Sequence, residues 1–149
     1  MQISNIIISP EHVFYRIKVA SKKQALQDLS MLASRLSNLP AREIFDVLLG
    51  RERLGTTGVG HGVAIPHGRF KAIDGIVGLF TQLAVPIDWD AVDGEVVDLV
   101  FLLLVPDEAG AEHLQALARV SSVLREIIQR KKLRRAKSRE ALFEILTAV

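Results

Sequence analysis

One run of ten residues, Val96–Val105 (VVDLVFLLLV), constrains the fold more than any other part of the chain. Asp98 is its only polar residue. A strand with one wet face alternates apolar and polar residues, whereas a strand buried on both faces is apolar almost throughout. The run therefore predicts a central strand in a sheet that is covered on both sides. We expect Pro106 to end it, because proline cannot donate to a strand ladder.

Three other segments have the character of strands. Ile76–Leu83 is rich in apolar residues, and Val63–His67 is a short extended segment in which Pro66 marks a strand end or an edge. Val13–Val19 is β-rich and partly alternating. This alternation predicts that four of its side chains share one side of the strand: Val13, Tyr15, Ile17 and Val19.

Four segments repeat their apolar residues at helical spacing: Lys22–Leu36, Pro40–Arg53, Ala111–Ile128 and a last segment capped by Ser138. Ser21 and Gln24 form a capping-box pattern at the start of the first helix. Helices mixed with strands predict an α/β protein, with a mixed central β-sheet and helices packed on both of its faces. The length of 149 residues predicts a single domain over residues 1–149.

The charge of the chain is uneven. Residues 130–139 hold seven of the 19 lysines and arginines and no acid, so the other 12 basic and 17 acidic residues carry a net charge of −5. A nucleic-acid-binding protein is usually basic over a whole face, so we expect no nucleic-acid partner. We interpret the run as a solvated face between two helices. The alternative is a docking segment for an acidic partner or a nucleic acid.

The composition excludes several kinds of function. The chain has no cysteine, which excludes a disulfide scaffold, a thiolate metal site and a cysteine nucleophile. Its longest apolar run, Leu99–Val105, is far shorter than the about 20 residues that a spanning helix needs. We therefore expect a soluble, cytoplasmic protein with no stable membrane insertion. The sequence leaves the oligomeric state open.

A glycine-rich segment carries the strongest functional signal. Five of the ten glycines lie within residues 55–68, together with Thr56, Thr57, His61 and His67. A glycine-rich backbone can turn successive N–H groups toward an anion, and the planar guanidinium of the nearby Arg51 suits bidentate contact with phosphate. The segment lacks the Gly-Lys-Ser/Thr of a nucleotide-binding P-loop and does not match the dinucleotide pattern G-x-G-x-x-G. The pattern therefore predicts a phosphate site that does not hold a free nucleotide.

His67 is the candidate nucleophile at the exit of this segment. An imidazole is largely neutral at pH 7 and keeps a nucleophilic lone pair. Phosphoryl transfer needs mainly positioning, with cations and N–H donors around the phosphoryl oxygens. We expect Pro66 to stiffen the approach to His67 and Gly68 to leave room for a partner. A zinc site of His61, His67 and His113 is disfavoured, because the metal would occupy the nucleophile. We therefore expect no metal and no cofactor.

The motif that runs from Arg51-Glu52 through Gly55-Thr56-Thr57-Gly58-Val59-Gly60-His61-Gly62-Val63-Ala64-Ile65-Pro66-His67-Gly68 resembles a known family signature. It is similar to the fructose/mannitol-type enzyme IIA domain of the phosphoenolpyruvate-dependent phosphotransferase system. Asp98–Pro106 and the helix that contains His113-Leu114 also resemble this family. A short chain with this pattern looks most like the nitrogen-regulatory branch. His61 departs from the family pattern, which leaves its role open.

The resemblance implies a function and a set of site residues. It implies that His67 is phosphorylated, on Nε2, by a histidine-containing phosphocarrier protein. It implies that Arg51 stabilises the phosphoryl group and that His113 lies beside the site as a second imidazole. It also implies regulation of target proteins by binding that depends on phosphorylation. Thr56 and Gly68 are candidates for the phosphoryl pocket, although a turn-capping role for Thr56 and Thr57 is equally compatible with the sequence.

Two other functions stay open at this point. A sugar-specific enzyme IIA would use the same chemistry and pass the phosphoryl group to a fructose or mannitol transporter component. A phosphatase or phosphotransferase acting on small molecules would need a general acid or base, for which Glu52, Asp107 and Glu108 are candidates. Three lesser expectations concern surfaces. We expect His61 to face solvent, His12 to lie on the surface, and an exposed apolar docking rim of Val59, Val63 and Ile65 or Phe70.

Overall fold

The strand predicted from the apolar run is β6, Val97–Pro106, and it is central to the sheet. The computed structural model describes residues 1–149. β6 pairs with β5 antiparallel and with β3 and β4 in parallel, while β1 pairs with β5 in parallel and β2 with β3 antiparallel. The bounds of these strands are β1 Val13–Ile17, β2 Gly58–Gly60, β3 Val63–Ala64, β4 His67–Phe70 and β5 Val77–Ile87.

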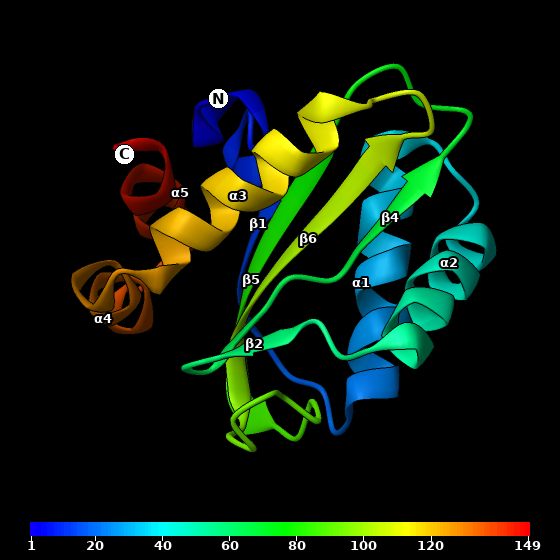
Figure 1. Ribbon diagram of the computed structural model, residues 1–149. Coiled ribbons are helices and arrows are strands. Elements are labelled where there is room, and N and C mark those ends of the chain that lie inside the picture. Colours follow the sequence, from blue (N-terminus) through cyan, green and yellow to red (C-terminus); the bar gives the residue numbers. More distant parts are fainter.

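Helices cover both faces of this mixed sheet (Figure 1). α1 (Lys22–Ser37) and α2 (Ala41–Leu54) lie on one face, and α3 (Ala111–Arg125), α4 (Ile127–Arg135) and α5 (Arg139–Thr147) lie on the other, where both chain ends are also found. Two 3-10 turns, η1 (Ile3–Asn5) and η2 (Pro10–His12), precede β1. The expected α/β class, with a mixed sheet and helices on both faces, is confirmed.

Alternate side chains of β6 belong to two separate apolar cores. Val100, Leu102 and Leu104 pack with residues of α1 and α2. Leu99, Phe101, Leu103 and Val105 pack with residues of α3, α4 and α5. All seven side chains are fully buried, so burial on both faces explains the continuous apolar run, as the sequence predicted.

The helix starts follow the predicted caps. The Ser21 hydroxyl accepts a hydrogen bond from the Gln24 N–H at 3.1 Å. Gln24 Oε1 in turn accepts from the Ala20 N–H at 2.8 Å, one residue before the usual partner in a capping box. The Ser138 hydroxyl accepts from the Ala141 N–H at 3.0 Å at the start of α5.

The predicted alternation along Val13–Val19 is wrong in its second half. The pairing of β1 with β5 shifts between Phe14 and Ile17, and Arg16 has a positive φ of 56°. This irregularity reverses the side-chain pattern. Val13 and Tyr15 pack with the α3–α5 layer, whereas Ile17 and Val19 pack with the α1–α2 layer. The four side chains therefore do not share one side.

The helix predicted over Ala111–Ile128 is divided in two. Glu126 is extended, with φ −72° and ψ 122°, so α3 ends at Arg125 and α4 begins at Ile127. Much of the basic run is therefore helical, which the sequence did not indicate. The buried Arg130 side chain donates hydrogen bonds to the carbonyls of Leu124 and Arg125 and so closes the end of α3. Most other basic side chains of the run are exposed, as expected for a solvated face.

Two smaller differences come from tertiary contacts. His12, expected on the surface, is buried, and its Nδ1 lies 2.7 Å from the Gly78 carbonyl of β5. β5, which was predicted over Ile76–Leu83, extends to Ile87, four residues beyond the predicted end. None of the helices combines the length and apolar character needed to cross a bilayer.

The packing of α4 gives a test of this arrangement. Leu133 is fully buried, whereas the neighbouring Lys132 is exposed. We expect Leu133→Ala to lower the free energy of unfolding by about 2–5 kcal/mol, because it leaves a cavity under α4. Lys132→Ala should change it by no more than about 0.5 kcal/mol. Urea denaturation of both variants measures the difference, and equal small effects would mean that α4 does not pack on the sheet.

Candidate phosphoryl-transfer site

The glycine-rich segment forms a tight hairpin from β2 and β3. Gly60, His61 and Gly62 all have positive φ values, of 106°, 57° and 81°, and the two glycines adopt them without steric cost. The His61 N–H donates to Asp93 Oδ2 at 2.9 Å, and its carbonyl accepts from Arg134 Nη2 at 2.6 Å. The His61 side chain is exposed, in agreement with the expectation of a solvent-facing loop residue.

His67 is the first residue of β4, directly after a break in the strand. β3 ends at Ala64 and β4 begins at His67, so the one extended segment predicted over Val63–His67 is divided between two short strands, and Pro66 lies in the break between them. Both short strands pair in parallel with β6, and His67 lies opposite Leu103. The Pro66 carbonyl accepts from the Leu103 N–H at 2.9 Å. The nucleophile candidate is therefore attached to the most buried strand of the sheet.

The His67 ring has a defined orientation. Its Nδ1 lies 2.8 Å from the Ile65 carbonyl oxygen. A carbonyl can only accept, so Nδ1 carries the proton and the lone pair of the neutral ring is on Nε2. The side chain is half-buried, and this desolvation lowers the pKa of His67 below its ordinary value. The Arg51 charge also lowers the pKa, while the Ile65 carbonyl and the Glu52 charge raise it.

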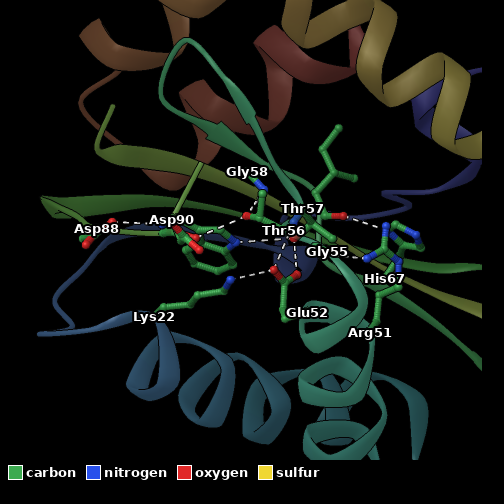
Figure 2. Close-up of polar contacts among 12 residues, drawn as sticks. Lys22, Arg51, Glu52, Gly55, Thr56, Thr57, Gly58, His67, Asp88 and Asp90 are labelled. Atoms are coloured by element: carbon green, nitrogen blue, oxygen red, sulfur yellow. Dashed lines mark hydrogen bonds and ion pairs between the residues drawn. The ribbon is translucent and has the colours of Figure 1, made fainter. Parts of the chain in front are cut away.

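Arg51 comes from the last turns of α2, and its side chain lies next to His67 (Figure 2). Its Nη1 donates to the Gly55 carbonyl at 2.7 Å. This bond occupies one of the five N–H groups of the guanidinium and fixes its direction. The remaining donors are available to an anion beside His67.

His113 comes from the first turn of α3, 46 positions after His67 in the chain. The two ring centroids are 5.6 Å apart, and the rings meet edge to face at 65°. Neither ring nitrogen of His113 has a hydrogen-bond partner. Desolvation lowers the pKa of His113, and the charges of Arg69 and His67 lower it further. The fold thus brings together the three residues that the resemblance implied: Arg51, His67 and His113.

The two threonines of the segment are engaged with the protein itself. Thr56 Oγ1 donates to the Trp89 carbonyl at 3.2 Å and accepts from the Gly58 N–H at 3.0 Å. The Thr57 hydroxyl donates a hydrogen bond to the buried Glu52 carboxylate. These contacts favour the turn-capping role that the sequence left open, and contact of Thr56 with a phosphoryl group stays a prediction.

Gly68 is buried against α2. A Cβ at this position would lie 2.5 Å from Val47 Cγ1 of α2. The space that we expected for a partner is therefore filled by the protein's own helix. Gly68 allows the helix that carries Arg51 to approach the strand that carries His67.

The expected apolar rim is mostly buried. Only Val59 is exposed, at 48%, whereas Val63, Ile65 and Phe70 are buried at 2–3%. Other exposed apolar side chains are adjacent to site residues in the chain. Leu54 precedes Gly55 and is 86% exposed, and Leu114 follows His113 and is 70% exposed.

Arg69 is a site neighbour that sequence reasoning missed. It lies two residues after His67 in β4, so both side chains are on the same face of the strand. Its Nη1 donates to the Asp107 carbonyl at 2.9 Å, and its charge acts on His113. The period-2 alternation from His67 was the available signal. No group of three or more histidine or acidic side chains lies close enough to hold a metal ion.

The family assignment agrees with this geometry. The family described as "Phosphoenolpyruvate-dependent sugar phosphotransferase system, EIIA 2" matches residues 6–149. The match spans nearly the whole chain, and the chain belongs to this family of enzyme IIA domains. The resemblance to the fructose/mannitol-type enzyme IIA domain is confirmed.

Individual relatives bear the name of the nitrogen-regulatory branch. A nitrogen regulatory protein of Bradyrhizobium diazoefficiens is 50% identical over 140 residues, which are 94% of this chain and 92% of that protein. Another from Escherichia coli K12 is 40% identical over 149 residues, 99% of this chain and 90% of that protein. The crystal structure of nitrogen regulatory protein IIA-Ntr from Neisseria meningitidis is similar with a TM-score of 0.89 and 37% identity, covering 93% of this chain and 95% of that one.

The environment of His67 predicts its titration. Because desolvation lowers the pKa of His67, the folded chain binds this proton at a lower pH than the unfolded chain. We expect the NMR titration of the His67 ring to have its midpoint below that of the same chain in urea. By linkage, the contribution of His67 to stability is lost as the pH falls through the ordinary histidine range. A midpoint at or above the value in urea would contradict the desolvated site.

Proposed function

We propose that the protein is a phosphocarrier that accepts a phosphoryl group on His67 Nε2 from a histidine-containing phosphocarrier protein. The supporting observation is the hydrogen bond between His67 Nδ1 and the Ile65 carbonyl, which leaves the lone pair on Nε2. The lowered pKa of His67 keeps the ring neutral, and therefore nucleophilic, at pH 7. Membership of the phosphotransferase-system family supports the same chemistry.

The transfer step needs no further reactant. The Nε2 lone pair attacks the phosphorus of the donor phosphohistidine, an N–P bond forms, and the donor's N–P bond breaks with its electron pair returning to the donor imidazole. His67 keeps its Nδ1 proton, and the Ile65 carbonyl stabilises the positive charge that the phosphorylated ring acquires. Reversal of the step returns the group to the donor, since an N–P bond is exchanged for an N–P bond, and attack on the same phosphorus by a nucleophile of another protein would pass the group on with His67 as the leaving group.

Arg51 and His113 would stabilise the phosphoryl oxygens. The Arg51 guanidinium is held by the Gly55 carbonyl and keeps free N–H donors beside His67. The unpartnered His113 ring, 5.6 Å from His67, can donate one hydrogen bond to the transferred group. Preorganised donors of this kind stabilise a transition state because they need no rearrangement during the reaction.

Phosphorylation would also act as a regulatory switch. A phosphoryl group adds about −1.5 to −2 charges to the site, which changes the electrostatics of docking. The exposed side chains of Leu54, Val59 and Leu114 would form the apolar part of the docking surface. The nitrogen-regulatory names of the relatives support target regulation over sugar transport. In this role the chain acts in the cytoplasm together with its donor.

The acid–base chemistry of a small-molecule phosphatase has less support. Of the three candidate carboxylates, Glu52 is buried and bonded to Lys22 and Thr57, so it is not free to exchange a proton with a substrate. Asp107 and Glu108 are exposed and lie on the connection to α3.

The second candidate function is a sugar-specific enzyme IIA. Rapid transfer of a labelled phosphoryl group from this chain to a fructose- or mannitol-specific acceptor domain would support that function.

A reconstituted transfer tests the proposed nucleophile. The chain is incubated with phosphoenolpyruvate, the first enzyme of the system and its small carrier protein, and is then analysed by intact mass. We expect one added phosphoryl group, which is absent in His67→Ala and present in His61→Ala. If active upstream proteins leave the mass of the wild-type chain unchanged, the proposal fails.

The role of Arg51 has a matched control on the same helix. We expect Arg51→Ala to slow phosphorylation on the order of 100-fold, because a preorganised donor to the phosphoryl oxygens is lost. Arg53→Ala removes an exposed arginine two residues away and should leave the rate unchanged. Rapid-quench kinetics give both rates, and circular dichroism checks the fold. Equal rates for the two variants would remove Arg51 from the site.

A further inference from the structure

A buried carboxylate lies behind the site, next to Arg51 in the chain. The Glu52 side chain is only 3% exposed. Burial of a charge is costly unless the charge is paired and hydrogen-bonded. Glu52 is therefore expected to have a strong set of partners, and the functions described above do not use it.

All of the partners of Glu52 are near the glycine-rich segment (Figure 2). Lys22 Nζ of α1 lies 2.8 Å from Glu52 Oε1 and 5.6 Å from the centre of the Trp89 ring. The Thr57 N–H donates to Glu52 Oε1 at 3.0 Å, and the Thr57 hydroxyl is bonded to Oε2. Trp89 Nε1 donates to the same hydroxyl at 3.4 Å. One carboxylate thus joins α1 and α2 to the peptide at Thr57.

The peptide at Thr57 is connected to the nucleophile by two hydrogen bonds. The Ile65 N–H donates to the Thr57 carbonyl at 3.0 Å. The Ile65 carbonyl then accepts from His67 Nδ1 at 2.8 Å. We define the chain of contacts Glu52–Thr57–Ile65–His67 as the relay. The carbonyl at its end is the group that places the lone pair on Nε2.

The same carboxylate bears on the position of the guanidinium. Arg51 precedes Glu52 on α2, and its Nη1 is held by the carbonyl of Gly55, two residues before Thr57. Because Glu52 fixes Thr57 against α2, it also fixes the short loop that contains Gly55. The positions of the Arg51 guanidinium and of the His67 ring therefore both depend on the buried Glu52 carboxylate.

We infer that Glu52 is a positioning residue for phosphoryl transfer, which acts through the relay to orient the His67 ring. This inference rests on the proposed function of His67. Glu52 would not touch the phosphoryl group, because its oxygens are occupied by Lys22 and Thr57. Its contribution is geometric, since a reacting group displaced by about 1 Å can lose on the order of 100-fold in rate.

Glu52 also contributes a charge to the surroundings of His67. The charged groups that face His67 are Arg51 and Glu52 from α2, and the second imidazole is His113 from α3; Arg69 lies on the same face of β4. The Glu52 charge raises the pKa of His67, against the lowering by burial and by Arg51. Neutralising Glu52 should thus lower the midpoint of the His67 titration further.

The first experiment compares Glu52→Gln with the matched control Glu43→Gln, an exposed acid in the first turn of the same helix. We expect Glu52→Gln to slow phosphoryl acceptance about 10–100-fold at saturating donor. The apparent KM for the donor protein should be unchanged, because the docking surface is intact. Glu43→Gln should match the wild-type chain in both quantities.

A second readout separates orientation from loss of structure. In ¹⁵N NMR of the histidine rings, the wild-type chain should have His67 predominantly in the Nδ1–H form. Glu52→Gln should mix the two tautomers and lower the titration midpoint of His67. A folded Glu52→Gln variant with the wild-type rate and the wild-type tautomer would overturn the inference, and so would a slower rate with an unchanged tautomer.

A second pair of variants covers the case in which Glu52→Gln does not fold. Thr57→Val removes the hydroxyl that Glu52 holds, and Thr57→Ser restores it. We expect the valine variant to show the mixed tautomer and slow transfer, and the serine variant to recover both; a valine variant like the wild type would overturn the relay. The tautomer measurement needs no phosphoryl donor, so it decides separately whether Glu52 orients the His67 ring. A wild-type chain that accepts no phosphoryl group would overturn the proposed function, and an unchanged tautomer in the variants would overturn the relay.

Discussion

The burial of β6 on both faces is the constraint from which the rest of the architecture follows. Its side chains alternate between two apolar cores, so each face of the sheet must be covered by helices. Three strands, β3, β4 and β5, pair directly with it. The segments that surround His67 are thereby attached to the least mobile kind of element in a protein, a central strand without solvent contact.

The site arises where three parts of the chain meet at one end of this strand. β4 runs parallel to β6, so its first residue, His67, lies opposite Leu103 near the end of β6. The chain leaves β6 at Pro106 and enters α3 at Ala111, which brings His113 to the His67 ring. α2 supplies Arg51 from the other layer. Each layer therefore contributes a different chemical group: a guanidinium from one and an imidazole from the other.

The sequence predicted those features that depend on local pattern. The apolar run of β6 and the caps at Ser21 and Ser138 are all properties of neighbouring residues. The shift at Arg16 and the division of the long helix at Glu126 depend on how an element packs, and no local pattern marks them.

Two features of the site were missed for related reasons. Glu52 contacts Lys22 and Thr57, and Trp89 donates to the Thr57 hydroxyl; Lys22, Thr57 and Trp89 are far apart in the sequence, so only the fold reveals this set of contacts. Gly68 was expected to leave room for a partner, but Val47 of α2 occupies that space, because the sequence does not state which group approaches a glycine. The roles of Arg51 and His67 in transfer came from residue chemistry together with the resemblance, and that of His113 from the resemblance alone. All three roles stay predictions, although the proximity of the residues is now a property of the structure.

The close approach of α2 to Gly68 makes the site vulnerable from its inner side. The methyl group of an alanine at position 68 would collide with Val47 and push α2 away from β4. This shift would increase the distance between the Arg51 guanidinium and the His67 imidazole, although both side chains would be chemically unchanged. The spacing between the two proposed site residues would therefore depend on a buried position that carries no reactive group.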